Sequence, residues 1–239
     1  MDHSNDRLIG ALVADLRPVR PLLPPALRAL IWLMFVAAVA VAIAMFADVG
    51  AVSRRMTAIP DMWLAVLGSI ATMATAAFAA VELSLPDRSR AWAFLPLPAL
   101  ALWVGASGFG CMRAYVLPGT HVAGIGEMRD CLLFIIGLSV PLSAALIVML
   151  RRAYSLAPPL TAAMAGLASA AAAATLLNFF HPFDAAAADL AVHSVAVLIV
   201  VAAAPAVGTR TLRNSFAALL RFELRVMGSI PSQHSGEPG

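Results

Sequence analysis

Long apolar stretches constrain this chain more than any other feature of its sequence. A helix needs about 20 mostly apolar residues to cross a bilayer, and several stretches meet that requirement. We predict about six membrane-spanning helices, at Ala29–Ala47, Met62–Val81, Ala91–Gly110, Leu132–Leu150, Pro158–Phe180 and Leu190–Val207. Hydrophobic residues make up 62% of the chain and charged residues 12%, against about 45–50% and about 25% in soluble domains. The sequence therefore predicts an all-α membrane protein, a helix bundle preceded by a short amphipathic helix.

The distribution of arginine indicates the orientation of the chain. All 16 basic residues are Arg, and most lie in the two terminal segments and in the connections on the same side of the membrane. Positive residues are enriched on the cytoplasmic side, so we predict a multi-pass protein of a bacterial inner membrane with both termini in the cytoplasm. Residues 1–28 are then a cytoplasmic N-terminal segment and a candidate for partner binding, residues 29–207 the transmembrane domain and residues 208–239 a cytoplasmic tail. The Arg-rich start has no apolar core like that of a signal peptide.

An apolar stripe runs along the predicted N-terminal helix. Its members recur at the spacing of one helical face and are Leu8, Ile9, Leu12, Val13 and Leu16. Pro18 ends this helix, and the proline-rich run to Pro25 is a stiff, extended connector to the membrane. Such a stripe can lie on lipid or insert into a groove on a partner protein, and the residue pattern leaves both open. In the second case Arg17 and Arg20 assist electrostatically.

The two cysteines lie beside a predicted outer loop. Cys111 and Cys131 flank the loop between the third and fourth spans, where a disulfide competes with simple burial of Cys111 as a small apolar residue. Cys131, next to Asp130, is predicted at a membrane edge where a thiolate can form and be reached. His181 follows the fifth span, and it shares with Cys131 a preference for thiophilic metal ions. Further candidate ligands are His121 and Asp184. Alternatively, Cys131 acts alone as an oxidisable thiol, with His181 favouring its thiolate.

Several classes of function lose support from the sequence. The acidic residues of the apolar stretches lie at predicted helix ends, whereas a proton-coupled transporter usually buries such a group near the midplane. The sequence contains no phosphate-binding loop, zinc-protease helix or serine nucleophile elbow, which argues against an enzyme. Basic loops are expected on the cytoplasmic side of a membrane protein and do not indicate contact with nucleic acid. A small transporter or permease, or a structural subunit of a membrane complex, is the alternative to a regulator.

Four short segments carry a family resemblance. They are Leu8–Val19 with Pro24, Pro25 and Arg28; Cys131–Leu132, opening a span with Ser139 and Pro141; Leu150–Arg152, followed by Pro158, Pro159 and Ala165–Leu167; and Gly208–Arg213. In this order they resemble the NrsF family of bacterial membrane proteins, negative regulators of a sigma factor of the extracytoplasmic-function (ECF) type.

The resemblance implies a membrane anti-sigma factor that holds an ECF sigma factor at the inner membrane until metal or oxidative stress arrives. Related members are linked to such stress through two periplasmic cysteines. The first matches Cys131, and His181, which precedes Pro182, stands in place of the second. This replacement departs from a two-cysteine disulfide switch but is compatible with a transient metal site, since thiolate and imidazole both suit such ions. We expect no resident cofactor, and the sigma factor and membrane lipids as partners.

Overall fold

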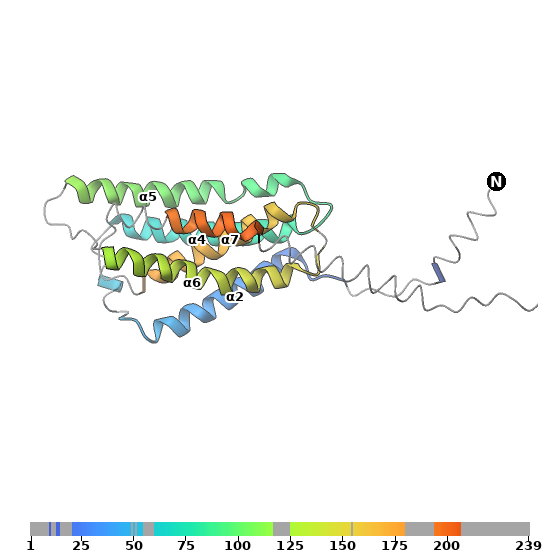
Figure 1. Ribbon diagram of the computed structural model, residues 1–239, viewed down its shortest axis with the longest axis horizontal. Helices are drawn as coiled ribbons and strands as arrows, with labels where there is room; N and C mark the ends of the chain where they lie inside the picture. Colours follow the sequence, from blue (N-terminus) through green and yellow to red (C-terminus); the bar gives the residue numbers. More distant parts are fainter. Residues whose placement is uncertain are drawn as a thin grey trace, which may run out of the picture.

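The protein is an α-helical bundle whose long helices run side by side along one axis (Figure 1). The computed structural model describes residues 10, 13–14, 21–48, 50, 52–54, 60–116, 125–153, 155–179 and 194–206. Its main elements are α2 (Pro25–Ala44), α4 (Pro60–Leu83), the 3-10 helix η1 (Arg90–Phe94), α5 (Leu97–Val116), α6 (Ile125–Leu150) and α7 (Pro158–Leu177). No strand occurs in these described residues, and the predicted all-α fold is confirmed.

Five of the described helices are long and apolar enough to cross a membrane. A further apolar helix, Ser194–Ala206, is shorter in its described part and lies within the sixth predicted span. The predicted membrane bundle of about six helices therefore agrees with the structure.

Two predicted boundaries differ from the observed ones. The sequence predicts a third span from Ala91, but η1 occupies that position and α5 begins only at Leu97. Pro96 has no backbone N–H, so a continuous helix through this point would lose a hydrogen bond. The fourth span is predicted from Leu132, whereas α6 begins at Ile125. Hydropathy marks only the apolar part of a helix, and the polar residues that precede it here are also helical.

Small residues let α7 occupy the centre of the bundle. In its apolar window 78% of the residues are buried, against 6% in the window within Arg90–Phe109, which covers η1 and the first part of α5. A Cβ atom added to Gly166 would lie 2.8 Å from the Cβ of Ala204, so α7 and the helix Ser194–Ala206 approach closely there. Thr175 of α7 also donates a hydrogen bond to Ser69 of α4 at 2.9 Å. In lipid, where the hydrophobic effect does not drive helices together, such close packing and hydrogen bonds hold them.

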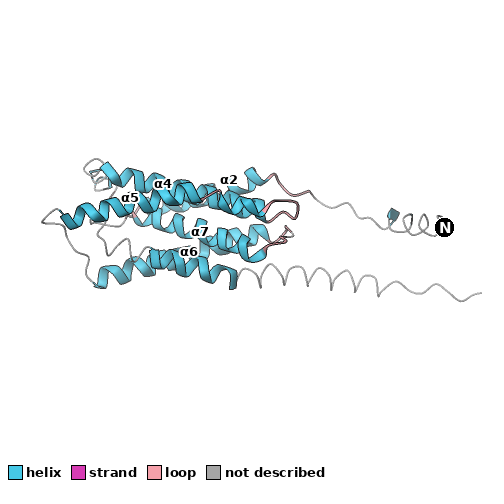
Figure 2. Ribbon diagram, turned by 90° about the horizontal axis from the view of Figure 1, so that it is seen from above, coloured by secondary structure: helices cyan, strands magenta, loops and turns pink. Residues whose placement is uncertain are grey.

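Helix α5 lies at the periphery and runs alongside α4 in both views (Figure 1, Figure 2). A Cβ atom added to Gly68 of α4 would meet the backbone of Trp103 at 2.7 Å, so glycine is required for this approach. Trp92 of η1 packs edge-to-face on Phe78, with ring centroids 5.6 Å apart. The short η1 helix thereby fixes the connection from α4 to α5.

Polar side chains tie the last turn of α4 to the start of α7. The hydroxyl oxygens of Ser155 and Thr161 lie 2.9 and 3.0 Å from the carbonyl oxygen of Leu83. This carbonyl is among the last four of α4 and has no partner within its own helix. Nearby, Glu82 is 5% exposed, and its charge is balanced by Arg88, whose Nε lies 3.0 Å from Oε2. The pair is an ionic contact without hydrogen-bond alignment, because Oε2 accepts no hydrogen bond among the described residues.

Arg28 brings α2 to the same end of the bundle. It lies in the first turn of α2, is 5% exposed, and donates to the carbonyl oxygen of Met149 in α6 at 3.0 Å. It also reaches the hydroxyl oxygen of Ser84, just after α4, at 3.5 Å. Arg28 thus links the start of α2 to the ends of α4 and α6. We call this end of the bundle the polar end, defined by Arg28, Leu83, Ser84, Met149, Ser155 and Thr161.

Candidate functional site

The candidate sensing residue Cys131 is buried within helix α6. It is 9% exposed and packs in an apolar cluster. The other buried members of this cluster are Ile135, Ala173, Leu177 and Ala196. The sequence predicts an accessible thiol at the membrane edge, just before the fourth span. Because α6 begins at Ile125, six positions earlier, Cys131 instead lies inside the helix. Its side chain packs against the other members of the cluster. We call this group of five residues the cysteine end of the bundle.

The cysteine end joins two helices that flank the segment containing His181. Leu177 is the last residue of α7 and Ala196 lies in the first turn of the next described helix, and both pack against the cluster of Cys131. His181 itself, like His121 and Asp184, lies outside the described residues. A contact between Cys131 and His181 therefore stays a prediction.

The alternative disulfide partner, Cys111, belongs to α5, near its C-terminal end. Its side chain lies outside the described part of the chain. The pairing of Cys111 with Cys131 stays a prediction as well.

The predicted amphipathic helix of the partner-binding segment is described at three positions. Gly10, Val13 and Ala14 are helical, and Val13, the one described member of the apolar stripe, is 58% exposed. The other predicted partner-binding residues lie outside the described part of the chain; they are Leu8, Ile9, Leu12, Leu16, Arg17 and Arg20.

The connector from this segment to the membrane is described from residue 21. Residues 21–24 form no regular structure, and Pro24 has the extended backbone angles φ −50° and ψ 143°. Pro25 occupies the first turn of α2, where its fixed φ suits a helix and its missing N–H has no intrahelical role. Leu22 and Leu23 are exposed. The connector is therefore extended at Pro24, and an extended course for the whole run from Pro18 stays a prediction.

Comparison with known families decides which kind of protein carries these features. The family model NrsF, negative regulator of sigma F, matches residues 12–214. The chain belongs to the NrsF family. No curated protein and no solved structure matches it. The match begins within the apolar stripe and continues past the last described helix, so it covers both the partner-binding segment from Leu12 onward and the bundle.

The NrsF assignment makes this chain a negative regulator of a sigma factor, built on a bundle of apolar helices that suits a membrane. For metal sensing, the described residues offer only part of a site. Among them, no group of three or more His, Cys, Asp or Glu side chains could hold a metal ion. Metal binding by Cys131 and His181 therefore stays a prediction.

Sequence reasoning missed two buried residues of this NrsF chain, Arg28 and Trp32. Both lie on the inner face of α2, and Trp32 is 0% exposed. The signal for Arg28 is visible in the sequence, because an arginine next to an apolar stretch, three residues after Pro25, is costly in a membrane unless it finds partners. The sequence places it in the cytoplasmic segment, since its partners come from much later in the chain.

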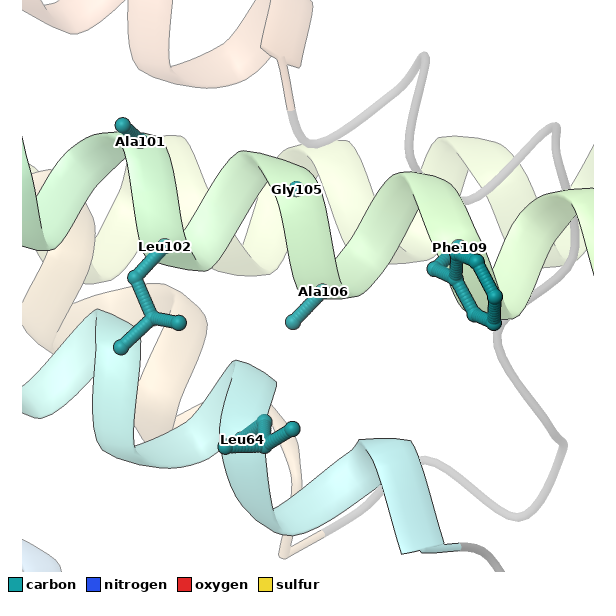
Figure 3. Close-up of a pocket in the computed structure, with 6 residues that line it drawn as sticks. All are labelled: Leu64, Ala101, Leu102, Gly105, Ala106 and Phe109. Carbon is teal, nitrogen blue, oxygen red and sulfur yellow. The ribbon is translucent and has the colours of Figure 1, made fainter.

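A shallow apolar groove lies between α4 and α5 (Figure 3). It has a volume of about 430 Å³, and its lining residues are Leu64, Ala101, Leu102, Gly105, Ala106 and Phe109. None of these side chains carries a polar atom, so the groove offers no group for catalysis or metal binding. In a bilayer, a surface of this kind suits acyl chains.

Proposed function

We propose that this protein is an inner-membrane anti-sigma factor that sequesters an ECF-type sigma factor on its N-terminal segment and releases it under periplasmic metal or oxidative stress. The observation that carries the proposal is the family match over residues 12–214. One match to a negative regulator of sigma F thus covers the apolar stripe from Leu12 onward together with the membrane bundle. Both termini are then cytoplasmic, as the distribution of arginine favours.

The N-terminal segment suits the binding step. An apolar helical face such as that of Val13, which is 58% exposed, gains free energy when a partner removes it from water. A groove on a sigma factor would accept the stripe in the manner of other helix-in-groove complexes. Arg17 and Arg20 would favour an acidic rim around that groove.

Cys131 suits the sensing step. A thiophilic metal ion would bind its thiolate and displace the thiol proton, and an oxidant would convert the same sulfur to a polar group. Either change acts inside an apolar cluster that joins α6, α7 and the helix Ser194–Ala206. A signal can shift the protein only by favouring one arrangement of these helices over another.

The binding step is tested with charges placed on the stripe. Leu12→Asp and Leu16→Asp should abolish co-purification of the sigma factor from membranes and raise its regulon, because each buries a charge at the interface. Ala14→Asp is the matched control, since helical periodicity puts Ala14 on the opposite face and it is exposed. Deleting residues 1–17 should have the same effect as the stripe variants. Unchanged repression in that deletion would rule out the segment as the binding element.

The sensing step is tested in the same reporter strain with cadmium and with peroxide. Cys131→Ser should reduce induction most, His181→Ala should reduce the cadmium response more than the peroxide response, and Cys111→Ser should matter least. A full cadmium response in Cys131→Ser contradicts the proposed sensor. A dominant effect of Cys111→Ser points instead to a disulfide between the two cysteines.

A further inference from the structure

Helix α2 is only loosely enclosed by the bundle. In its apolar window 22% of the residues are buried, against 78% in α7. Its buried residues lie on one face and are Arg28, Ala29, Trp32 and Val36. Two of these four carry hydrogen-bond donors, which is unusual for the interior of a membrane bundle.

Both donors bind backbone carbonyls of α6. The guanidinium of Arg28 donates to the carbonyl oxygen of Met149 at 3.0 Å, and the indole Nε1–H of Trp32 donates to that of Leu142 at 3.2 Å. The donors are about one turn apart on α2, and the acceptors about two turns apart on α6. Two such contacts fix both the height and the rotation of α2 against α6, which one contact would not do.

The Met149 carbonyl is suited to a cation from another helix. It is one of the last four carbonyls of α6, which have no partner within the helix. Its neighbours Val148 and Leu150 accept from the amides of Arg151 and Ala153. The last turn of α6 carries no basic residue of its own, so Arg28 supplies the positive charge that the negative end of the helix dipole favours.

Helix α6 also contains the candidate sensor and a weak point. Cys131 lies near its start, Met149 at its end, and Pro141 between them. Pro141 has no N–H to donate, so the carbonyl of Gly137 loses its usual partner and α6 bends there at less cost than elsewhere. Cys131 and the two carbonyls that hold α2 thus lie on one helix, on opposite sides of Pro141, so a bend of α6 at Pro141 changes their relative position.

We propose that Arg28 and Trp32 are positioning residues for regulation: they fasten α2 to α6, so that the position of α6 sets where α2 presents the N-terminal segment. The proposal rests on the proposed binding role of that segment. The described residues before α2 end at Pro24, which has an extended backbone and directly precedes α2. A displacement of α2 therefore displaces Pro24 and the residues before it.

The test measures the position of the connector independently of sigma-factor binding. Leu23, which is 52% exposed, is replaced by Cys in a Cys111→Ser, Cys131→Ser background, and its reaction with a membrane-impermeant maleimide is timed in vesicles. Trp32→Phe keeps the ring and removes the donor, and Arg28→Gln removes the charge. We expect either to change the labelling rate by about threefold to tenfold, and Arg28→Lys to restore part of the wild-type rate. The matched control is Trp63→Phe, since Trp63 is 47% exposed on α4.

A second readout connects position to regulation. In the chain with both native cysteines, Trp32→Phe and Arg28→Gln should raise basal reporter activity and reduce its further increase on addition of cadmium. Both variants should still insert into the membrane and be extracted in folded form. Unchanged labelling rates in both variants overturn the inference, whatever the reporter shows. If the labelling rates change as expected but deletion of residues 1–17 leaves repression unchanged, the proposed binding segment is refuted and the inference on Arg28 and Trp32 stands. The two failures are therefore distinguishable.

Discussion

The two ends of α6 are held in different ways. At the polar end, Arg28 reaches the Met149 carbonyl, and Thr161 approaches the Leu83 carbonyl, so directional hydrogen bonds meet at helix termini. At the cysteine end, Cys131 packs among apolar side chains, with Ile135 fully buried beside it. Hydrogen bonds fix the distance and angle between two groups, whereas dispersion contacts are individually weak and non-directional.

Under the proposed function, this difference suits a sensor that responds at one end and holds its output at the other. Oxidation or metal binding at Cys131 would change the size and polarity of a site that has few geometric constraints, so the surrounding helices would be able to move apart. The polar end cannot adjust continuously, because a lost bond leaves a helix carbonyl unpaired in a poorly hydrated region. When helices move at the cysteine end, we therefore expect each hydrogen bond at the polar end either to break or to stay intact.

The largest effect should come from the cysteine end. Ile135→Ala should lower the free energy of unfolding by about 2 kcal/mol, since it opens a cavity in the cluster. The cost is below that in a soluble core, because lipid solvates the removed methyl groups as well as the protein does. Leu133→Ala is the matched control on the same helix, as Leu133 is 53% exposed and should cost little. Denaturant titration in mixed micelles measures both, and equal losses would contradict the packing of this cluster.

A smaller effect is expected at the polar end. Thr161→Val keeps the side-chain shape but removes the hydroxyl near the Leu83 carbonyl and Ser155, so we expect a loss of about 1 kcal/mol. Thr161→Ser retains the hydroxyl and should restore most of that stability. If both variants lose the same amount, the methyl group and not the hydrogen bond stabilises this end, and the contrast between the ends disappears.

The smallest expected effect is a gain in stability, and it comes from a residue of α6 between the cysteine end and the polar end. Ser139 of α6 is 0% exposed, and its hydroxyl has no hydrogen-bond partner among the described residues. Ser139→Ala should therefore stabilise the protein by about 0.5 kcal/mol, because a buried polar group without a partner is costly. Ser169→Ala serves as the comparison, since the Ser169 hydroxyl bonds the Ala165 carbonyl at 2.8 Å. A clear loss of stability in Ser139→Ala means that its hydroxyl has a partner in solution, such as a bound water.

Hydropathy predicted the helices well because a bilayer requires long apolar runs with satisfied backbone groups. The close packing of α7 follows from its Ala-rich sequence, because small residues let helices approach one another. The boundary errors have local causes. Pro96 separates η1 from α5, and the polar first turns of α6 carry no hydropathy signal although they are helical.

The site was harder to predict, because its geometry depends on residues distant in sequence. The sequence identified Cys131 as a candidate, but its burial is set by Ala173 and Ala196 on two later helices. In the same way, nothing around Arg28 identifies the Met149 carbonyl as its acceptor. Backbone acceptors are invisible in a residue pattern, since every residue has one.

The distance in sequence between Arg28 and its acceptors affects how the chain is made. The hydroxyl of Ser84 comes 56 residues later and the carbonyl of Met149 comes 121 residues later. At about 5–20 residues per second, a ribosome needs on the order of 10 s to supply the second of these. During that interval the guanidinium has to stay hydrated at the membrane surface, so α2 cannot take its final depth. The first helix to be synthesised is then among the last to dock, and a chain that is truncated before α6 lacks the acceptor that completes it.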